Sequence, residues 1–172
     1  MSTTSTLLQF RLNGEPVSTQ VEAYETLLEV TRTRCGLVGA RESCGQGLCG
    51  CCAIVVNGET VTGCIFPAMH AEGCDVATIE GVAQDGKLDA VQQAFIDCGA
   101  FQCGFCTSGF ILMSRQLLHR NPDPTDAEIR NYLAGNLCRC GAYPEILAAV
   151  KLAGERMRAV RSQAAPTDPL AR

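Results

Sequence analysis

The 172-residue sequence lacks the features that direct a chain to nucleic acid or to a membrane. Its formal net charge is −4, and it has no run of the basic residues that phosphate binding needs. No apolar stretch approaches the ~20 residues of a membrane-spanning helix. Residues 1–6 show no basic segment followed by an apolar one, so we expect no secretory signal and a cytoplasmic location.

Cysteine is the residue that stands out, with 12 copies in the chain. In a secreted protein, so many cysteines would predict a framework of disulfides. Because no secretory signal is visible, and because the cytosol keeps thiols reduced, metal binding is the better interpretation.

The first cysteine group has the spacing Cys44-x4-Cys49-x2-Cys52 and ends with Cys64. This is the pattern of plant-type [2Fe–2S] ferredoxins. Five glycines lie between positions 36 and 50. Glycine lets the backbone wrap closely around a bulky ligand and leaves amide N–H groups free to point at sulfur.

The second cysteine group consists of the pairs Cys103-x2-Cys106 and Cys138-x-Cys140. A helical pattern separates the two pairs, so each pair can lie at a helix end and the pairs can meet in space. Four thiolates in two tight pairs predict a second metal site.

Two other metal centres compete with this interpretation. Zinc also binds pairs of cysteines, and it competes most strongly at the second group taken alone. The x4 spacing between Cys44 and Cys49 is loose for a zinc site, and the presence of both groups together favours iron. A Rieske cluster needs two histidine ligands, but neither His70 nor His119 lies in a Cys-x-His unit.

Four cysteines remain outside the two groups. Cys51 lies inside the first ligand loop and could compete with Cys52, but the x2 spacing favours Cys52. We expect all four to be small, buried, apolar side chains. They are Cys35, Cys51, Cys74 and Cys98.

The first half of the chain has the alternating pattern of strands. A strand over residues 8–12 is followed by Asn13-Gly14, a strong hairpin signal, and a return strand over 17–21. A short helix is expected over 26–34. Further strands are expected over residues 53–56, 59–61 and 76–79.

After residues 80–86 the apolar period changes from two to 3.6. Helices are expected over 88–97, 108–119, the segment between Thr125 and Gly135, and 144–160, with Thr125 and Glu128 forming a capping box. The sequence therefore predicts an α+β fold in which a β-grasp, ferredoxin-like domain is followed by a four-helix bundle. The expected limits are 1–81 for the first domain, 82–161 for the second and 162–172 for a polar tail.

These motifs resemble the iron–sulfur subunit of the xanthine oxidase (molybdenum hydroxylase) family, over about residues 5–155. Three motifs in order carry the resemblance: Cys44-Gly45-Gln46-Gly47-Leu48-Cys49-Gly50-Cys51-Cys52, Gln102-Cys103-Gly104-Phe105-Cys106-Thr107 and Gly135-Asn136-Leu137-Cys138-Arg139-Cys140. None of the departures from the family pattern removes a ligand. They are Cys51 for the usual alanine, Ser43 for glycine, Thr107-Ser108-Gly109 for Thr-Pro-Gly, and Gly141-Ala142-Tyr143 for Thr-Gly-Tyr.

The resemblance implies two [2Fe–2S] clusters and a contact with molybdopterin. Gln102 matches the family glutamine that contacts the pterin, and Cys140 would lie between iron and pterin. The implied ligands are Cys44, Cys49, Cys52 and Cys64 for the outer cluster, and Cys103, Cys106, Cys138 and Cys140 for the inner one, nearest the molybdopterin.

The resemblance also implies a function, that of an electron-transfer subunit in an oxidoreductase complex. Its partners would be a large subunit with molybdopterin, in the cytosine dinucleotide form, and usually a medium subunit with FAD. This chain has no glycine-rich turn of its own for FAD and no recognisable catalytic base, so substrate chemistry would lie in the large subunit. A zinc-stabilised interaction protein and a free-standing ferredoxin are the alternatives. The substrate stays open among N-heterocycles, purines, aldehydes and carbon monoxide.

Overall fold

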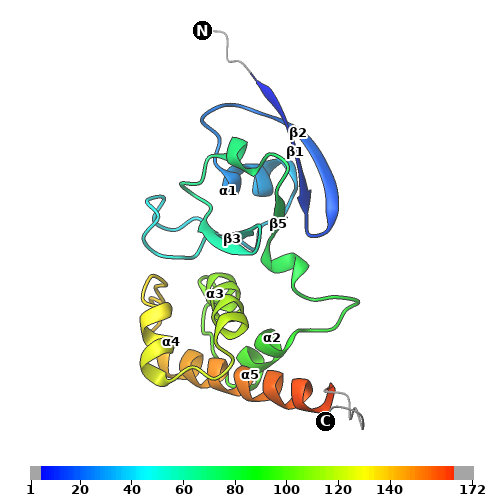
Figure 1. Ribbon diagram of the computed structural model, residues 1–172. Helices are drawn as coiled ribbons and strands as arrows, with labels where there is room; N and C mark the ends of the chain where they lie inside the picture. Colours follow the sequence, from blue (N-terminus) through cyan, green and yellow to red (C-terminus); the bar gives the residue numbers. More distant parts are fainter. Residues whose placement is uncertain (1–4, 165–172) are drawn as a thin grey trace.

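The computed structural model describes residues 5–164 and has two stacked parts. Figure 1 shows a part with strands, coloured blue to green, above a part that consists of helices, coloured green to orange-red. The strand part comes first along the chain. Mixed α/β content, with strands and helices in separate parts, agrees with the predicted α+β class.

The strand part is built on a five-stranded sheet in the order β2-β1-β5-β3-β4. β1 (Thr6–Leu12) pairs antiparallel with β2 (Glu15–Val21) and parallel with β5 (Asp75–Ala77). β3 (Ala53–Val56) pairs antiparallel with both β4 (Glu59–Thr62) and β5. The loop between the helix after β2 and the start of β3 contains the first cysteine motif.

The hairpin predicted at the start of the chain is confirmed. Asn13 and Gly14 form the turn with φ values of 52° and 91°, in the left-handed region that hairpin turns of this type require. Leu8, Phe10 and Leu12 alternate along β1 and are buried in the core of the strand part. The period-two pattern therefore placed the correct face of this strand inside.

The helix predicted over 26–34 is correct in position but irregular in form. It begins as α1 (Leu27–Glu29) and continues as a π-helical turn, η1 (Val30–Arg34). The buried Thr31 hydroxyl donates to two carbonyls of the preceding turn, at 3.0 and 3.1 Å. Such hydroxyl–carbonyl bonds compete with the backbone ladder, which gives a local reason for the wider turn.

The strand predicted over 76–79 is too long, because β5 ends at residue 77. The Asn13 side chain accepts the Thr78 N–H at 2.8 Å and donates to the Thr78 hydroxyl at 3.0 Å, so the backbone leaves the sheet there. The chain then enters a 3₁₀ turn, η3 (Ile79–Gly81). An earlier 3₁₀ turn, η2 (Ala68–Ala71), precedes β5.

The helical part contains α2 (Ala90–Asp97), α3 (Thr107–Arg120), α4 (Asp126–Tyr132) and α5 (Tyr143–Ala164). The predicted capping box is confirmed: Thr125 accepts the backbone N–H of the third residue of α4, and that residue's carboxylate accepts the Thr125 N–H at 2.7 Å. Each predicted helix exists within a few residues of its expected limits.

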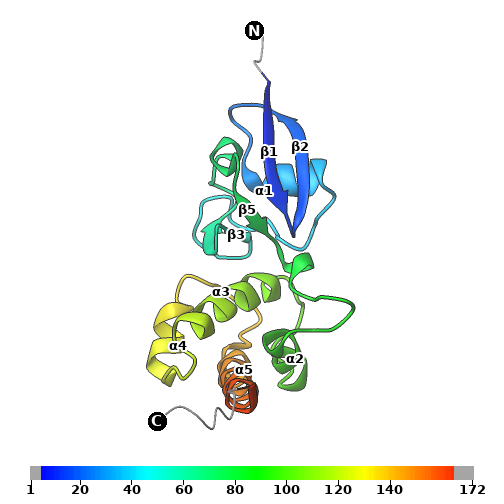
Figure 2. The ribbon, with the colours of Figure 1, turned by 45° about the vertical axis from the view of Figure 1, so that its right-hand side comes forward.

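A regular four-helix bundle is not confirmed. α5 is seen lengthwise in Figure 1 and nearly end-on in Figure 2, where α3 is the helix seen lengthwise, so these two helices cross. The four helices nevertheless share one core, with Phe95, Phe110, Leu118, Ile129 and Val150 fully buried at its centre.

The chain end differs from the prediction in part. α5 continues to Ala164, so the first residues of the predicted 162–172 tail are helical, and residues 165–172 lie outside the described range. The division at 81 and 82 stays a prediction. Within residues 5–164, no helix has the length and apolarity needed to cross a membrane.

Candidate metal centres

The loop before β3 directs backbone amides at the Cys44 sulfur. The N–H groups of Gln46 and Leu48 donate to this sulfur at 3.4 and 3.3 Å. Gly47 has a φ of 78°, a left-handed value that lets the loop curl around the sulfur. The amides, with that of Gln46 first, lower the pKa of Cys44 to about 6, and the Cys49 thiol adds a further hydrogen bond. The expectation that loop amides would point at sulfur is met here.

In the other half of the first group, Cys52 is buried and Cys64 is half-buried. Cys52, 1% exposed, is hydrogen-bonded to the Cys64 thiol, and the charge that Cys49 would carry also acts on it. Burial is the largest cause that raises the pKa of Cys52 to about 12. The structure therefore brings the four predicted thiols together as two pairs: Cys44 with Cys49, and Cys52 with Cys64.

The second group starts in the turn that precedes α3. The Phe105 N–H, and then the thiol of Cys140, lower the pKa of Cys103. Gly104, with a φ of 79°, makes the turn that brings this amide back to the sulfur. Both Cys103 and Cys140 are exposed, so this pair faces outward.

The second pair of this group lies deeper. Burial raises the pKa of Cys106 to about 12, with the Cys138 thiol as its hydrogen-bond partner. Burial opposes ionisation of Cys138 as well, but the Ala142 N–H, the Cys106 thiol and neighbouring amides lower its pKa overall. The second group thus contains one exposed pair and one pair nearer the interior, whereas each pair of the first group has one buried and one half-buried thiol.

Gln102 lies beside the outward pair. Its side-chain Nε2 donates to the Cys140 carbonyl at 3.2 Å, from 38 positions away in the sequence. The two residues predicted to form the pterin side of the site are therefore neighbours. The pterin contact itself stays a prediction.

A hydrogen bond that the sequence did not reveal joins the two groups. The Leu137 N–H donates to the carbonyl of Cys49 at 3.0 Å. Because Leu137 directly precedes Cys138, one backbone hydrogen bond connects a cysteine of the first group to the neighbour of a cysteine of the second. Close packing supports it: a Cβ atom on Gly109 would come within 2.1 Å of the Gly50 carbonyl oxygen. The Asn136 amide also donates to that oxygen, at 3.4 Å.

Two more contacts fix the loops on either side of this junction. The Ser108 hydroxyl donates to the Gly39 carbonyl at 2.7 Å, and the Arg41 guanidinium lies 5.4 Å from the centre of the Phe105 ring. A further contact missed by sequence reasoning lies at the second group, where the Tyr143 hydroxyl accepts the Cys138 N–H at 2.9 Å. None of these contacts has a signal in the local sequence, because each joins residues on different elements or across a turn.

The four remaining cysteines are less uniform than predicted. Cys51 is buried, at 4% exposure, but the other three are only half-buried, so the expectation is wrong for them. They lie at the margins of elements, after η1, before β5 and after α2, where the chain leaves the core. They are Cys35, Cys74 and Cys98.

The donor set fits a two-iron cluster. Tetrahedral zinc needs four donors around one point, whereas a [2Fe–2S] cluster distributes four thiolates over two irons. Thiols in two pairs, with amides directed at sulfur, match the second requirement.

Comparison with known proteins matches each part to a family of iron–sulfur domains. Residues 10–77 match the family described as "2Fe-2S iron-sulfur cluster binding domain", and residues 78–151 match "[2Fe-2S] binding domain". The chain is 46% identical over 149 residues to the nicotinate dehydrogenase small FeS subunit of Eubacterium barkeri, covering 87% of this chain and 95% of that protein. It is 37% identical to the aldehyde oxidoreductase iron–sulfur-binding subunit of Escherichia coli (strain K12), over 86% of this chain and 72% of that one.

Solved structures agree with these matches. Quinoline 2-oxidoreductase from Pseudomonas putida 86 superposes with a TM-score of 0.86 at 38% identity, covering 90% of this chain and 97% of that chain. The aldehyde oxidoreductase from Desulfovibrio gigas gives a TM-score of 0.85 at 34% identity, and the match spans only 17% of that much longer chain. The chain belongs to the family of iron–sulfur small subunits of the molybdenum hydroxylases, as its cysteine motifs predicted.

Proposed function

We propose that this chain is the electron-transfer subunit of a molybdenum-containing oxidoreductase. It passes single electrons from the molybdenum centre of a large partner subunit through two [2Fe–2S] clusters to FAD or another acceptor. The observation that carries the proposal is the arrangement of eight thiols in two groups that the Leu137–Cys49 hydrogen bond links.

The pairing of thiols supports a specific set of ligands. Each iron of a [2Fe–2S] cluster takes two thiolates, so we assign one hydrogen-bonded thiol pair to each iron. The proposed pairs are Cys44 with Cys49 and Cys52 with Cys64 in the first cluster, and Cys103 with Cys140 and Cys106 with Cys138 in the second.

The chain contributes position and electrostatics. When bound, a [2Fe–2S] cluster accepts and releases one electron at a time. The amides of Gln46 and Leu48 stabilise negative charge on the Cys44 sulfur, and the Phe105 amide does so for Cys103. The junction at Cys49 and Leu137 holds the groups in contact, so electrons cross a short distance between them.

We assign the two ends of the chain's electron path by their exposure and neighbours. Gln102 and Cys140 form the end at which electrons arrive from a large subunit containing molybdopterin cytosine dinucleotide, because the Gln102 amide leaves its carbonyl oxygen available to a pterin. Exposed apolar side chains surround this end, as expected for a surface that a partner covers: Phe101, Phe105, Leu137 and Tyr143. The Cys44 loop forms the other end, facing a medium FAD subunit.

The relatives bear on the substrate indirectly. Subunits of this kind are named for nicotinate dehydrogenase, for aldehyde oxidoreductase and for a xanthine dehydrogenase. Because similar small subunits accompany such different activities, we assign substrate choice to the large subunit. The cytoplasmic location expected from the sequence stays a prediction.

The test is metal and sulfide analysis of the purified chain, followed by dithionite titration under electron paramagnetic resonance. We expect about four irons and four acid-labile sulfides per chain, and two distinct signals, because the two groups differ in exposure and hydrogen bonding. Zinc with little iron would replace this proposal with a zinc-stabilised interaction protein. Purification from its source without a molybdenum-containing partner would indicate a free-standing ferredoxin.

Gln102→Ala tests the proposed molybdenum side. In the assembled complex, a single turnover of substrate should persist while the clusters are reduced more slowly or the pterin is retained less well. Gln116→Ala is a matched control, since it removes a side-chain amide that donates to Glu59 and lies near the C-terminal end of α3, away from Gln102 in the sequence. Unchanged cluster reduction and full molybdenum occupancy in Gln102→Ala would leave Gln102 a purely structural residue.

A further inference from the structure

An apolar groove lies between α4 and α5 in the helical part. Its cavity has a volume of about 420 Å³, and core side chains such as Phe110, Ile129 and Ile146 line it. Figure 1 shows α4 and the first turns of α5 side by side at the left of the helical part. This volume is within the range of about 300–1,000 Å³ that ligand sites occupy, so the groove has room for a large apolar group.

The groove extends to the ligand loop of the second cysteine group. Leu137 and Tyr143 both line it and are 52% and 47% exposed, so it opens to solvent there. Leu137 directly precedes Cys138, and the Tyr143 hydroxyl accepts the Cys138 N–H at 2.9 Å. The same two side chains belong to the exposed apolar set around the end at which we assigned the arrival of electrons. The groove is therefore continuous with the surface that we assigned to the large subunit.

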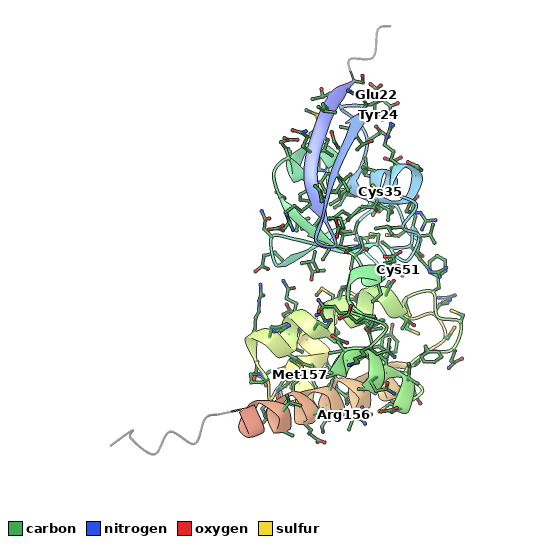
Figure 3. The ribbon with its side chains drawn as sticks, turned by 90° about the vertical axis from the view of Figure 1, so that its right-hand side faces the viewer. Glu22, Tyr24, Cys35, Cys51, Arg156 and Met157 are labelled. Atoms are coloured by element: carbon green, nitrogen blue, oxygen red, sulfur yellow. The ribbon has the colours of Figure 1, made fainter. Side chains whose placement is uncertain are left out.

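The groove also has a guanidinium without a carboxylate partner. Among the described side chains of the helical part, Arg130 and Arg139 are the arginines that form no ion pair, and Arg130 lines the groove. Asp126, one turn before Arg130 on α4, is already bound to Lys151 at 2.8 Å. The paired arginines include one that Figure 3 shows on α5, at the end of the molecule away from the strands. They are Arg115, Arg120, Arg156 and Arg158.

We propose that the α4–α5 groove anchors the large molybdopterin subunit, which places an aromatic or aliphatic side chain in the groove and pairs a neighbouring carboxylate with Arg130. Large side chains in apolar pockets, with arginine among them, provide most of the binding energy of protein interfaces. A planar guanidinium matches a carboxylate with two parallel N–H groups. The inference rests on the proposed function, which supplies the large subunit.

The first test is competitive assembly. Wild-type and variant chains with different tags are co-expressed with the partner subunits, and mass spectrometry measures the ratio in which they enter the molybdenum-containing complex. Arg130→Glu sets a like charge against the partner's carboxylate, so we expect the ratio of variant to wild type to fall by about 30-fold or more. Ala134→Trp fills the groove from an exposed lining position and should lower the ratio by a similar factor. Arg130→Lys keeps the charge without the planar fork and should have an intermediate ratio.

Lys87→Glu is the matched control for the change of charge. Lys87 is exposed and forms no ion pair among the described residues. It belongs to the segment between η3 and α2, which extends to the right in Figure 1, whereas α4 lies on the left. Circular dichroism and iron content of each unassembled variant should equal those of the wild type. If Arg130→Glu fails to fold, Arg130→Gln takes its place, with an expected fall of about tenfold.

The second test identifies the occupant by photo-cross-linking. p-Benzoylphenylalanine replaces Glu145, an exposed residue between the lining residues Pro144 and Ile146. In the assembled complex, it should link to a peptide of the large subunit that has an apolar side chain beside a carboxylate.

Three results would overturn the inference. The first is an assembly ratio that stays at the wild-type value in both Arg130→Glu and Ala134→Trp. The second is an equal fall of that ratio in Lys87→Glu. The third is a cross-link to the medium subunit or to a second copy of this chain, or no cross-link at all. If the wild-type chain assembles with no molybdenum-containing protein, the proposed function itself is wrong, and the inference falls with it.

Discussion

Gly109→Ala should destabilise the protein even though alanine is the better helix former. Gly109 lies in the first turn of α3, and its hypothetical Cβ would be 2.1 Å from the Gly50 carbonyl oxygen. Ordinary contact begins at 3.4 Å, so helix and loop must separate by about 1.3 Å. Overpacking of this kind costs about 1–3 kcal/mol, and loss of the Leu137–Cys49 hydrogen bond adds about 1 kcal/mol. Alanine returns about 1 kcal/mol at most through helix propensity, so a net loss of about 2 kcal/mol is expected.

The assay is denaturant unfolding of the cluster-loaded chain, followed by circular dichroism and by cluster absorbance. A second readout is the magnetic interaction between the two reduced clusters, which should weaken in Gly109→Ala while iron content persists. Gly135→Ala is the matched control, because its Cβ would meet no atom within 4 Å. If Gly109→Ala unfolds within about 0.5 kcal/mol of the wild type, with unchanged coupling, the junction is looser than its geometry indicates.

Other substitutions test the assignments separately. Cys52→Ala should lower iron from about four to about two per chain, while Cys51→Ala keeps it; the opposite result in iron analysis would show that the ligand register is wrong. Glu25→Gln should lower the free energy of unfolding by about 2 kcal/mol at pH 7, because the buried carboxylate accepts hydrogen bonds from the Arg34 guanidinium and a backbone N–H. Burial alone would raise the pKa of the Glu25 carboxyl, but these hydrogen bonds lower it overall. The stability that the carboxylate provides is therefore fully present above its usual pKa of 4.5, and it is lost as the pH falls through the lower pKa of the folded state. A gap between variant and wild type that stays constant in urea unfolding from pH 7 down to about pH 3 would contradict this. Tyr143→Phe should cost about 1 kcal/mol and alter only the second cluster's signal, since it removes the acceptor of one ligand's N–H.

The cysteine groups were predictable because their information is local. Spacing within a loop fixes which thiols can converge, as at Cys44 and Cys49, and glycines nearby let the amides turn toward sulfur. Strand alternation and capping chemistry are equally local, so the first hairpin and the start of α4 at Thr125 followed from a few residues.

What sequence reasoning missed depends on distant pairs. The π-helical turn at Thr31 arises from which carbonyls its hydroxyl can reach inside a packed core, and the early end of β5 depends on Asn13, 65 positions away from its partner Thr78. The crossing of α3 and α5 depends on side-chain packing over the whole helical part. Half-burial of Cys98 follows from its place at the end of α2, which an apolar residue type alone does not reveal.

The junction between the two cysteine groups is made largely by main-chain atoms. The Cys49 carbonyl, the Leu137 amide and the bare backbone of Gly109 against Gly50 form its centre. Most substitutions elsewhere change side chains and leave these atoms where they are. Descendants of such a sequence could therefore diverge widely on their surfaces and acquire new partners, while the gap that an electron must cross inside the subunit would stay nearly constant.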